Sequence, residues 1–336
     1  MVIVAAVEVV TASDYGGART PRSAAVRSSR LAPSSRGEWM KWRRSSGGDG
    51  VEDLRGTGGG RGGLTPGRVG GGVGGLGIVG VIIVLLVTVL GGGGVGGFNP
   101  DASLDGLPQQ PAATDGSFDA SAPDPDADLR DFVTFVVGDV QDSWEEAFQR
   151  AGERYERTTL RLFTGGVNTG CGQASSATGP FYCPADHYVY LDLGFFRELR
   201  DRYGAPGDFA QAYVIAHEFG HHVQNIRGIL PEVAQEQRRD PGRANDLSVR
   251  LELQADCLAG IWGRSAYDDQ LLDDGDLEEG LAAAASVGDD RLQAQAGAPV
   301  DRESFTHGSS EQRTRWFLAG FQNGDATACN TFGVDL

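Results

Sequence analysis

A run of residues without charge, from position 69 to position 100, divides this chain of 336 residues into two unequal parts. Residues 73–90, at the centre of the run, are Val, Leu, Ile and Gly apart from one Thr. A helix rising about 1.5 Å per residue spans most of the roughly 30 Å hydrocarbon core of a membrane over this length. The sequence therefore predicts one transmembrane helix at residues 73–92. A cleaved signal peptide is the alternative, but glycines rather than an Ala-x-Ala cleavage site follow Leu90.

The charges on the two sides of this run differ in sign. Residues 1–73 contain more Lys and Arg than Asp and Glu, whereas the whole chain has a net charge of −17, so the part after the run is strongly acidic. The positive-inside rule then places the basic part in the cytoplasm and the acidic part outside, in a single-pass protein of the cell membrane. Because phosphate contacts need clustered Lys and Arg, we expect no nucleic-acid partner for the acidic part.

Composition divides the chain further. Residues 1–39 show no helical or strand period and are predicted to be a disordered extension, and residues 40–72 form a basic, glycine-rich head. Residues 93–128 are rich in Pro, Ala, Asp and Gly, which is typical of an extended acidic linker. The folded domain is expected at residues 129–336.

The pattern of apolar residues in this domain predicts an α+β fold. Residues 158–163 and 188–193 alternate like strands, with a loop between them. Three- and four-residue apolar steps predict helices instead. The predicted helices are 128–155, 195–203, 208–226, 243–267, 277–285 and 309–322. A small strand region followed by helices is typical of the α+β class.

Four cysteines, Cys171, Cys183, Cys257 and Cys329, all follow the predicted membrane helix. An even number in an exported domain favours disulfide bonds. Of the three possible pairings we favour Cys171–Cys183, which closes a short loop rich in Gly and Ser, and Cys257–Cys329, which ties the chain end to a central helix. Zinc ligation and redox exchange by these cysteines are disfavoured because no Cys-x-x-Cys pair occurs.

The predicted helix 208–226 carries His217 and His221, which lie four residues apart and therefore on one face. Two imidazoles so placed can bind one tetrahedral Zn²⁺ ion. Glu218, beside the first histidine, can take a proton from a water molecule at that ion. Incidental histidines on a solvated helix are the alternative, but the residues just before the motif are apolar.

Zinc requires a third protein ligand. The metzincin extension is absent, since Gln224 and Arg227 stand where it has Gly and His. A second predicted helix offers Glu252 as the ligand, and Asp256, four residues later, can accept the second ring hydrogen of a ligand histidine. An exposed helix carboxylate is the alternative for Glu252.

These motifs resemble the gluzincin arrangement and, in combination, the bacterial putative neutral zinc metallopeptidase family. The segments that carry the resemblance are Met40-Lys-Trp-Arg-Arg, the glycine-rich apolar run, Cys171-Gly-x-Ala-Ser-Ser-Ala-x-Gly-Pro-Phe-Tyr-Cys183, Ala216-His-Glu-Phe-Gly-His-His-Val-Gln224, Ala255-Asp-Cys-Leu-Ala-Gly260 and Thr306-His-Gly-Ser-Ser-Glu-Gln-Arg313. The resemblance covers the chain from about residue 40 to the C-terminus. It implies a zincin-like fold with a small sheet and a helical active-site core. Because Met40 matches the usual start of the family, residues 1–39 are expected to be a non-native extension. One departure from the gluzincin thermolysin is Leu251, where that enzyme has Asn before its ligand glutamate.

His307 lies in the segment Thr306-His-Gly308, just before a predicted helix, and is a candidate to stabilise the oxyanion of a tetrahedral intermediate. The segment is similar to a Thr-His-Pro segment of membrane zinc endopeptidases that process prenylated proteins, with Gly308 in place of the proline. A histidine that only leads into the helix is the alternative. His187 and His222 are expected to be structural or exposed.

Together these features predict a membrane-anchored zinc metallopeptidase, of the endopeptidase kind, that acts on peptide or protein substrates. His217, His221 and Glu252 are the expected ligands of Zn²⁺, and Glu218 activates water. Residues 187–192 are the strand along which we expect an extended peptide to lie. The alternative is a zinc-containing binding or scaffold protein of the cell envelope with little turnover. Glu218 argues against that alternative, because a binding site needs the ligands without the base.

Overall fold

The computed structural model describes residues 40–44, 50–56 and 123–336. The extension 1–39, the predicted membrane helix 73–92 and most of the acidic linker lie outside these ranges. Within the described ranges, no helix is both long and apolar enough to cross a lipid bilayer.

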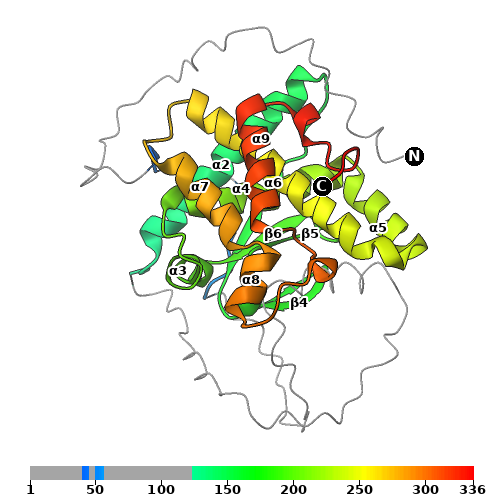
Figure 1. Ribbon diagram of the computed structural model, residues 1–336. Helices are drawn as coiled ribbons and strands as arrows, with labels where there is room; N and C mark the ends of the chain where they lie inside the picture. The colour runs from blue at the N-terminus through cyan, green and yellow to red at the C-terminus, as the bar shows by residue number, and fades with distance from the viewer. Residues whose placement is uncertain (1–39, 45–49, 57–122) are drawn as a thin grey trace, which may run out of the picture.

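The described residues form an α+β fold with a small mixed sheet and mostly helices, as the sequence predicts (Figure 1). The strands are β1 (Val51–Asp53), β2 (Leu160–Phe163), β3 (Gly166–Thr169), β4 (Gly172–Ser175), β5 (Phe181–Cys183) and β6 (Tyr188–Asp192). The helices are α2 (Ala127–Arg150), α3 (Gly194–Asp201), α4 (Asp208–Ile226), α5 (Ile229–Arg239), α6 (Ala244–Asp268), α7 (Asp276–Ser286), α8 (Asp289–Gln295) and α9 (Ser310–Asn323).

The four-stranded sheet has the order β1-β2-β6-β5. The first three strands are parallel, and β5 pairs with β6 in antiparallel fashion. Because β6 lies between two strands, our expectation that it receives an extended peptide by strand addition is wrong. The edge that remains on this side of the sheet belongs to β5.

Alternating side chains direct the two faces of the sheet to different partners. Leu160 and Leu162 of β2 belong to the main core that the sheet shares with the helices. Phe181 and Tyr190 point to the other face, where their rings stack at a centroid distance of 5.0 Å and belong to a smaller core with residues of the β3–β4 hairpin.

The helical half is built on α4, which packs against α2, α6 and α7. In Figure 1, α6, α7 and α9 lie next to one another, and the strands β4, β5 and β6 lie below them. α4 is buried along nearly its whole length from Phe209 to Gln224. A helix that is buried on all sides is positioned by packing alone, and this fixes the face that carries the histidines.

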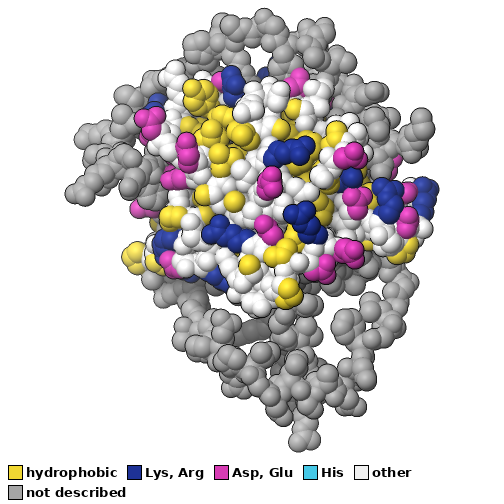
Figure 2. Space-filling model, in the orientation of Figure 1, with side chains coloured by type: hydrophobic (Ala, Val, Ile, Leu, Met, Phe, Trp, Pro, Cys, Tyr) yellow, Lys and Arg dark blue, Asp and Glu magenta, His cyan; other side chains and the backbone are white. Residues whose placement is uncertain are grey.

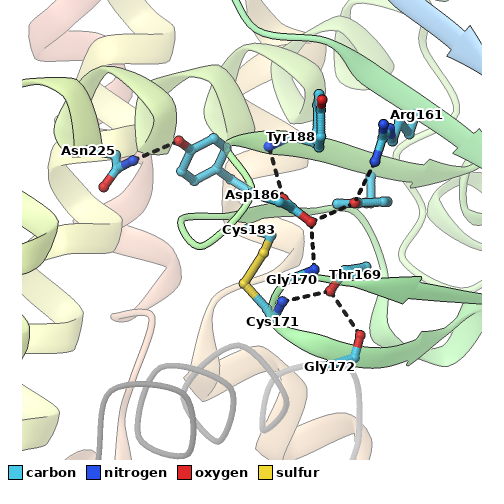
Figure 3. The surroundings of a disulfide bond; sticks show 11 residues. Arg161, Thr169, Gly170, Cys171, Gly172, Cys183, Asp186, Tyr188 and Asn225 are labelled. Carbon is cyan, nitrogen blue, oxygen red and sulfur yellow. Dashed lines mark hydrogen bonds between the residues drawn. A yellow bond between two sulfur atoms is a disulfide. The ribbon is translucent and has the colours of Figure 1, made fainter.

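Two disulfide bonds have the pairing that we favour from the sequence, Cys171–Cys183 and Cys257–Cys329. The first joins the turn between β3 and β4 to β5 (Figure 3). Asp186 holds the same turn by accepting a hydrogen bond from the backbone nitrogen of Gly170 at 2.6 Å. Residues 164–187, which we predicted to be a loop, contain the three short strands β3, β4 and β5.

Parts of the predicted head belong to the same fold as the domain. Met40 is 2% exposed and lies in the main core, and β1 pairs with β2. The Arg55 side chain, just after β1, forms an ion pair of 2.8 Å with Asp124. The folded unit therefore includes described residues that precede position 129, where we predicted the domain to begin. Residues 40–44 and 50–56 pack in the same folded unit as the domain.

Candidate metal centre

The side chains that could hold a metal come from two buried helices. His217, Glu218 and His221 lie on α4, and Glu252 lies on α6. All four residues are 5 to 6% exposed. In keeping with this burial, no histidine is visible on the face of the molecule in Figure 2, where charged and apolar side chains are interspersed.

A glycine lets the two helices approach closely at this point. A Cβ atom at Gly220 would lie 3.0 Å from the backbone oxygen of Ala255, so any side chain there would push α4 away from α6. As a result His217 Nε2 lies 3.2 Å from Glu252 Oε2, and His221 Nε2 lies 3.5 Å from Glu252 Oε1. One ligand atom from each of these three residues lies within 4.8 Å of the others.

Hydrogen bonds to the Nδ1 atoms of His217 and His221 fix the tautomer of both rings. His217 Nδ1 lies 2.9 Å from Asp256 Oδ1, and the carboxylate can only accept. His221 Nδ1 lies 2.8 Å from Gln224 Oε1, whose amide group is oriented because its Nε2 donates to Leu251 and Gln254. Each Nδ1 therefore carries the hydrogen. In the neutral rings both Nε2 atoms then present lone pairs towards Glu252.

This arrangement of electron-pair donors fits a zinc ion. His221 Nε2 is buried and has no hydrogen-bond partner. Burial lowers the pKa of His217, but the carboxylates of Asp256 and Glu252 outweigh it and raise that pKa to about 10, so the position between ring and carboxylate favours a cation. Two imidazole nitrogens and one carboxylate oxygen are a common ligand set of catalytic zinc, which keeps its fourth position open.

Glu218 lies beside these ligands without being one of them. Burial raises the pKa of its carboxyl group, and the charges of His221 and His217 oppose the shift. The backbone N–H of Tyr182, on the edge strand β5, lies near this carboxyl group and also opposes the rise of its pKa. The Glu218 Oε2 atom is buried without a hydrogen-bond partner and is therefore available to a water molecule or a substrate.

Comparison with known protein families identifies the family of this chain. The model of a family described as putative neutral zinc metallopeptidase matches residues 40–332. The chain belongs to this family. The uncharacterized protein YpfJ of Escherichia coli (strain K12) is 47% identical over 228 residues, which cover 68% of this chain and 79% of YpfJ. The uncharacterized proteins Mb2605 of Mycobacterium bovis and Rv2575 of Mycobacterium tuberculosis (strain H37Rv) are each 42% identical over 243 residues, covering 68% of this chain and 82% of the relative. No solved structure matches the chain.

In this member of the zinc metallopeptidase family, the loop before α9 brings His307 to the site. His307 is 6% exposed, and its charge is near enough to Glu252 to help lower the pKa of that carboxyl group, against the effect of burial. Asp289 holds the loop, because its Oδ2 accepts hydrogen bonds from the backbone nitrogens of residues 306, 307 and 308. Gly308 has a φ of +92°, which proline cannot adopt, so this loop cannot have the shape of a Thr-His-Pro segment.

A further set of residues supports Asp256 and was not predicted from the sequence. Arg313 of α9 donates from Nε to Asp256 Oδ2 at 2.8 Å, and Tyr213 donates to Asp256 Oδ1 at 2.6 Å. Although burial raises the pKa of Asp256, Arg313 and His217 lower it, and the carboxylate stays ionised. The one available signal was that a carboxylate predicted to be buried requires a cationic partner.

The other two histidines do not reach the ligand set. His222 Nε2 lies 2.6 Å from the backbone oxygen of Glu156 and its Nδ1 lies 3.2 Å from the hydroxyl group of Tyr182. His187 is exposed in the turn before β6. Both positions agree with the structural or exposed roles predicted for them.

Proposed function

We propose that this chain is a zinc-dependent peptidase in which His217, His221 and Glu252 hold the metal. The observation that carries the proposal is the meeting of these three ligands beside the buried, unpaired Oε2 atom of Glu218. Zinc bound here supplies a Lewis acid that acidifies a water molecule and polarises a carbonyl group.

Glu218 is the proposed general base and acid. Its raised pKa lets the carboxylate accept a proton from the attacking water and then pass that proton to the leaving amine of the substrate. His307 is proposed to donate a hydrogen bond to the carbonyl oxygen as negative charge develops on it. Its placement by Asp289 supports this role, because a fixed donor needs no reorganisation during the reaction.

A peptide substrate is supported by the edge strand β5. Tyr182 of this strand directs its backbone nitrogen to Glu218, so the free edge of β5 borders the proposed catalytic group. An extended peptide can pair with such an edge and bring one of its carbonyl groups to the metal.

We further propose that residues 73–92 attach the enzyme to a membrane, on the strength of their uncharged, apolar sequence. An extracytoplasmic position of the domain is supported by its two disulfide bonds, which form and persist in oxidising compartments.

The test combines metal analysis of the purified protein with cleavage of a broad peptide library. We expect about one zinc per chain and hydrolysis that a chelator abolishes. Glu218→Gln should retain its zinc but lose at least ~10²-fold in hydrolysis, because an amide cannot accept the proton. Glu252→Gln should lose both zinc and activity, since a neutral amide is a poorer ligand.

Glu311→Gln is the matched control, since Glu311 is an exposed glutamate on α9. It should leave zinc content and hydrolysis unchanged. Full hydrolysis by Glu218→Gln, or equal loss of zinc from Glu218→Gln and Glu252→Gln, would show that the roles of the two glutamates are wrongly assigned. Zinc without any hydrolysis in the unchanged protein would favour the binding or scaffold alternative.

A further inference from the structure

One face of α4 is directed to a single residue of the edge strand β5. This face carries Glu218, His222 and Asn225, whose spacing of four and then three positions places them on one side of the helix. The backbone N–H of Tyr182 lies near the carboxyl group of Glu218. The hydroxyl oxygen of Tyr182 lies 3.2 Å from His222 Nδ1 and 2.9 Å from Asn225 Nδ2. All three side chains on this face therefore meet Tyr182, while the zinc ligands of α4 lie on the neighbouring face.

The hydrogen bonds of the Tyr182 hydroxyl group are complementary. His222 Nε2 lies 2.6 Å from the backbone oxygen of Glu156, which can only accept, so Nε2 carries the hydrogen. In the neutral ring Nδ1 then accepts a hydrogen bond from the Tyr182 hydroxyl group. The same hydroxyl oxygen accepts a hydrogen bond from Asn225 (Figure 3). Tyr182 and His222 are 6% and 1% exposed. A buried hydroxyl group that both donates and accepts in this way is held in one position.

The backbone of Tyr182 faces the free side of β5. Tyr182 is paired with Val189 of β6 in antiparallel fashion, and the backbone nitrogen of Val189 donates to Thr159 on the far side of β6. Opposite residues of antiparallel strands either bond to each other or both face away, so Tyr182 faces away from β6. Pro180 and Pro184, on either side of the strand, have no N–H to offer. Tyr182 is thus the residue of this segment that can present a backbone N–H to the free side.

We propose that His222 and Asn225 are positioning residues of the peptidase, which act through the Tyr182 hydroxyl group to fix the substrate-binding edge relative to Glu218. This inference rests on the proposed function, because it assigns the β5 edge to a peptide substrate. One helix supplies two metal ligands, the proposed base and both anchors of Tyr182. Loss of the anchors leaves the ligands in place but lets the strand move away from Glu218. A misplacement of about 1 Å can slow a reaction about 10²-fold.

The first experiment removes the anchor from either end, as Tyr182→Phe and as Asn225→Ala, in the full chain. The probe is a fluorogenic form of the library peptide that the unchanged protein cleaves fastest. Both variants should retain their zinc. We expect kcat to fall about 10-fold or more while KM changes less than about 2-fold, because alignment is lost and binding is not. An unchanged kcat, or a rise of KM alone, would contradict the proposal. His222 is left unchanged because it follows the ligand His221 directly.

Tyr190→Phe is the matched control. Its hydroxyl group lies on the adjacent strand and contacts Asp186 and Arg161 instead of α4, so its removal should leave kcat unchanged. The double variant of Tyr182→Phe and Asn225→Ala adds a second control. Both substitutions act on one hydrogen bond, so the double variant should be about as active as Tyr182→Phe alone. Effects on kcat that multiply would show two independent structural losses and would overturn the proposal.

The second experiment needs no substrate. Hydrogen exchange of the backbone amides of residues 181–183 should be faster in Tyr182→Phe and Asn225→Ala by about 5-fold or more, as expected for a lost hydrogen bond. Tyr190→Phe should not change it. Equal exchange in all four proteins would show that α4 does not hold β5 through this hydroxyl group. Absence of hydrolysis by the unchanged protein would refute the proposed function instead, and the exchange rates would still decide whether the anchor exists.

Discussion

His217 and His221 reach one metal position with different partners on their Nδ1 atoms. Asp256 accepts from His217 as a carboxylate that is itself paired with Arg313, whereas Gln224 accepts from His221 as a neutral amide. A carboxylate partner raises the basicity of the ring more than an amide does. The two ligands are therefore equally well oriented but not electronically alike.

Gln224 gives a clearer test of this orientation than Asp256 does. Removing the neutral amide leaves no unpaired buried charge, whereas removing Asp256 would leave Arg313 unpaired. Gln224→Ala frees the ring of His221, and we expect the affinity for zinc to fall about 10- to 100-fold. Competition with a chromophoric chelator measures the change. Asn225→Ala is the matched control, since the adjacent Asn225 bonds to Tyr182 and not to a ligand. Equal zinc affinity of the two variants would contradict the role given to Gln224.

The sequence predicts the residues of the site that lie a few positions apart on one helix. It predicts fewer of the residues that meet only through contacts between distant segments. His217 and His221 share a face by helical spacing alone, and Glu252 and Asp256 repeat the same spacing. Asp289 and Arg313 act through contacts across 18 and 57 positions of the chain, and nothing in their local sequence distinguishes them from solvated charges. Only the packing of α8 and α9 reveals these roles.

α6 and α9 lie in near backbone contact because Gly320 stands between them. A Cβ atom at Gly320 would lie 1.9 Å from the backbone oxygen of Cys257. Gly320→Ala must therefore push the helices apart, and we expect a loss of stability of about 1–3 kcal/mol or more in thermal unfolding. Because Arg313 lies on the same helix, zinc affinity should also fall.

The control for this substitution is Gly138→Ala in α2, where a Cβ atom has open space around it. Alanine favours a helix over glycine, so this variant should be as stable as the unsubstituted protein or more stable by up to about 1 kcal/mol. Similar melting temperatures for Gly320→Ala and Gly138→Ala would show that the α6–α9 contact can relax.

Long, strongly periodic elements could be predicted, and short or polar ones could not. The apolar composition of 208–226 predicts α4 with its observed bounds. β1, with three residues, has too little sequence to show a strand period, and β3 and β4 form a hairpin of mostly small or polar residues. α5 was also missed, because its second half is Gln-Glu-Gln-Arg-Arg and its stability comes from burial of Ile229, Leu230 and Val233.

At the scale of the whole molecule, two described segments that lie far apart in the sequence meet at Arg55 and Asp124. Arg55 and Asp124 lie within two residues of the range 57–122, which is outside the described residues, and an ion pair joins them. Burial lowers the pKa of Arg55, but Asp53 and Asp124 outweigh this effect and keep the guanidinium charged. A segment predicted from composition to be a separate head thus contributes a strand to the sheet.

The pairing of β1 with β2 limits how the protein can be attached to a membrane. If residues 73–92 enter a membrane, residues 40–56 and the domain must still lie on one side of it, because β1 pairs with β2. We predict that single cysteines introduced as Arg43→Cys and Arg315→Cys, both at exposed positions, react with an impermeant maleimide from the same side. The four native cysteines are all in disulfide bonds and should not react. Labelling after permeabilisation controls for reactivity. Labelling at position 315 from one side and at position 43 only from the other would show that the head and the domain are separated by the membrane, as the positive-inside rule alone suggests.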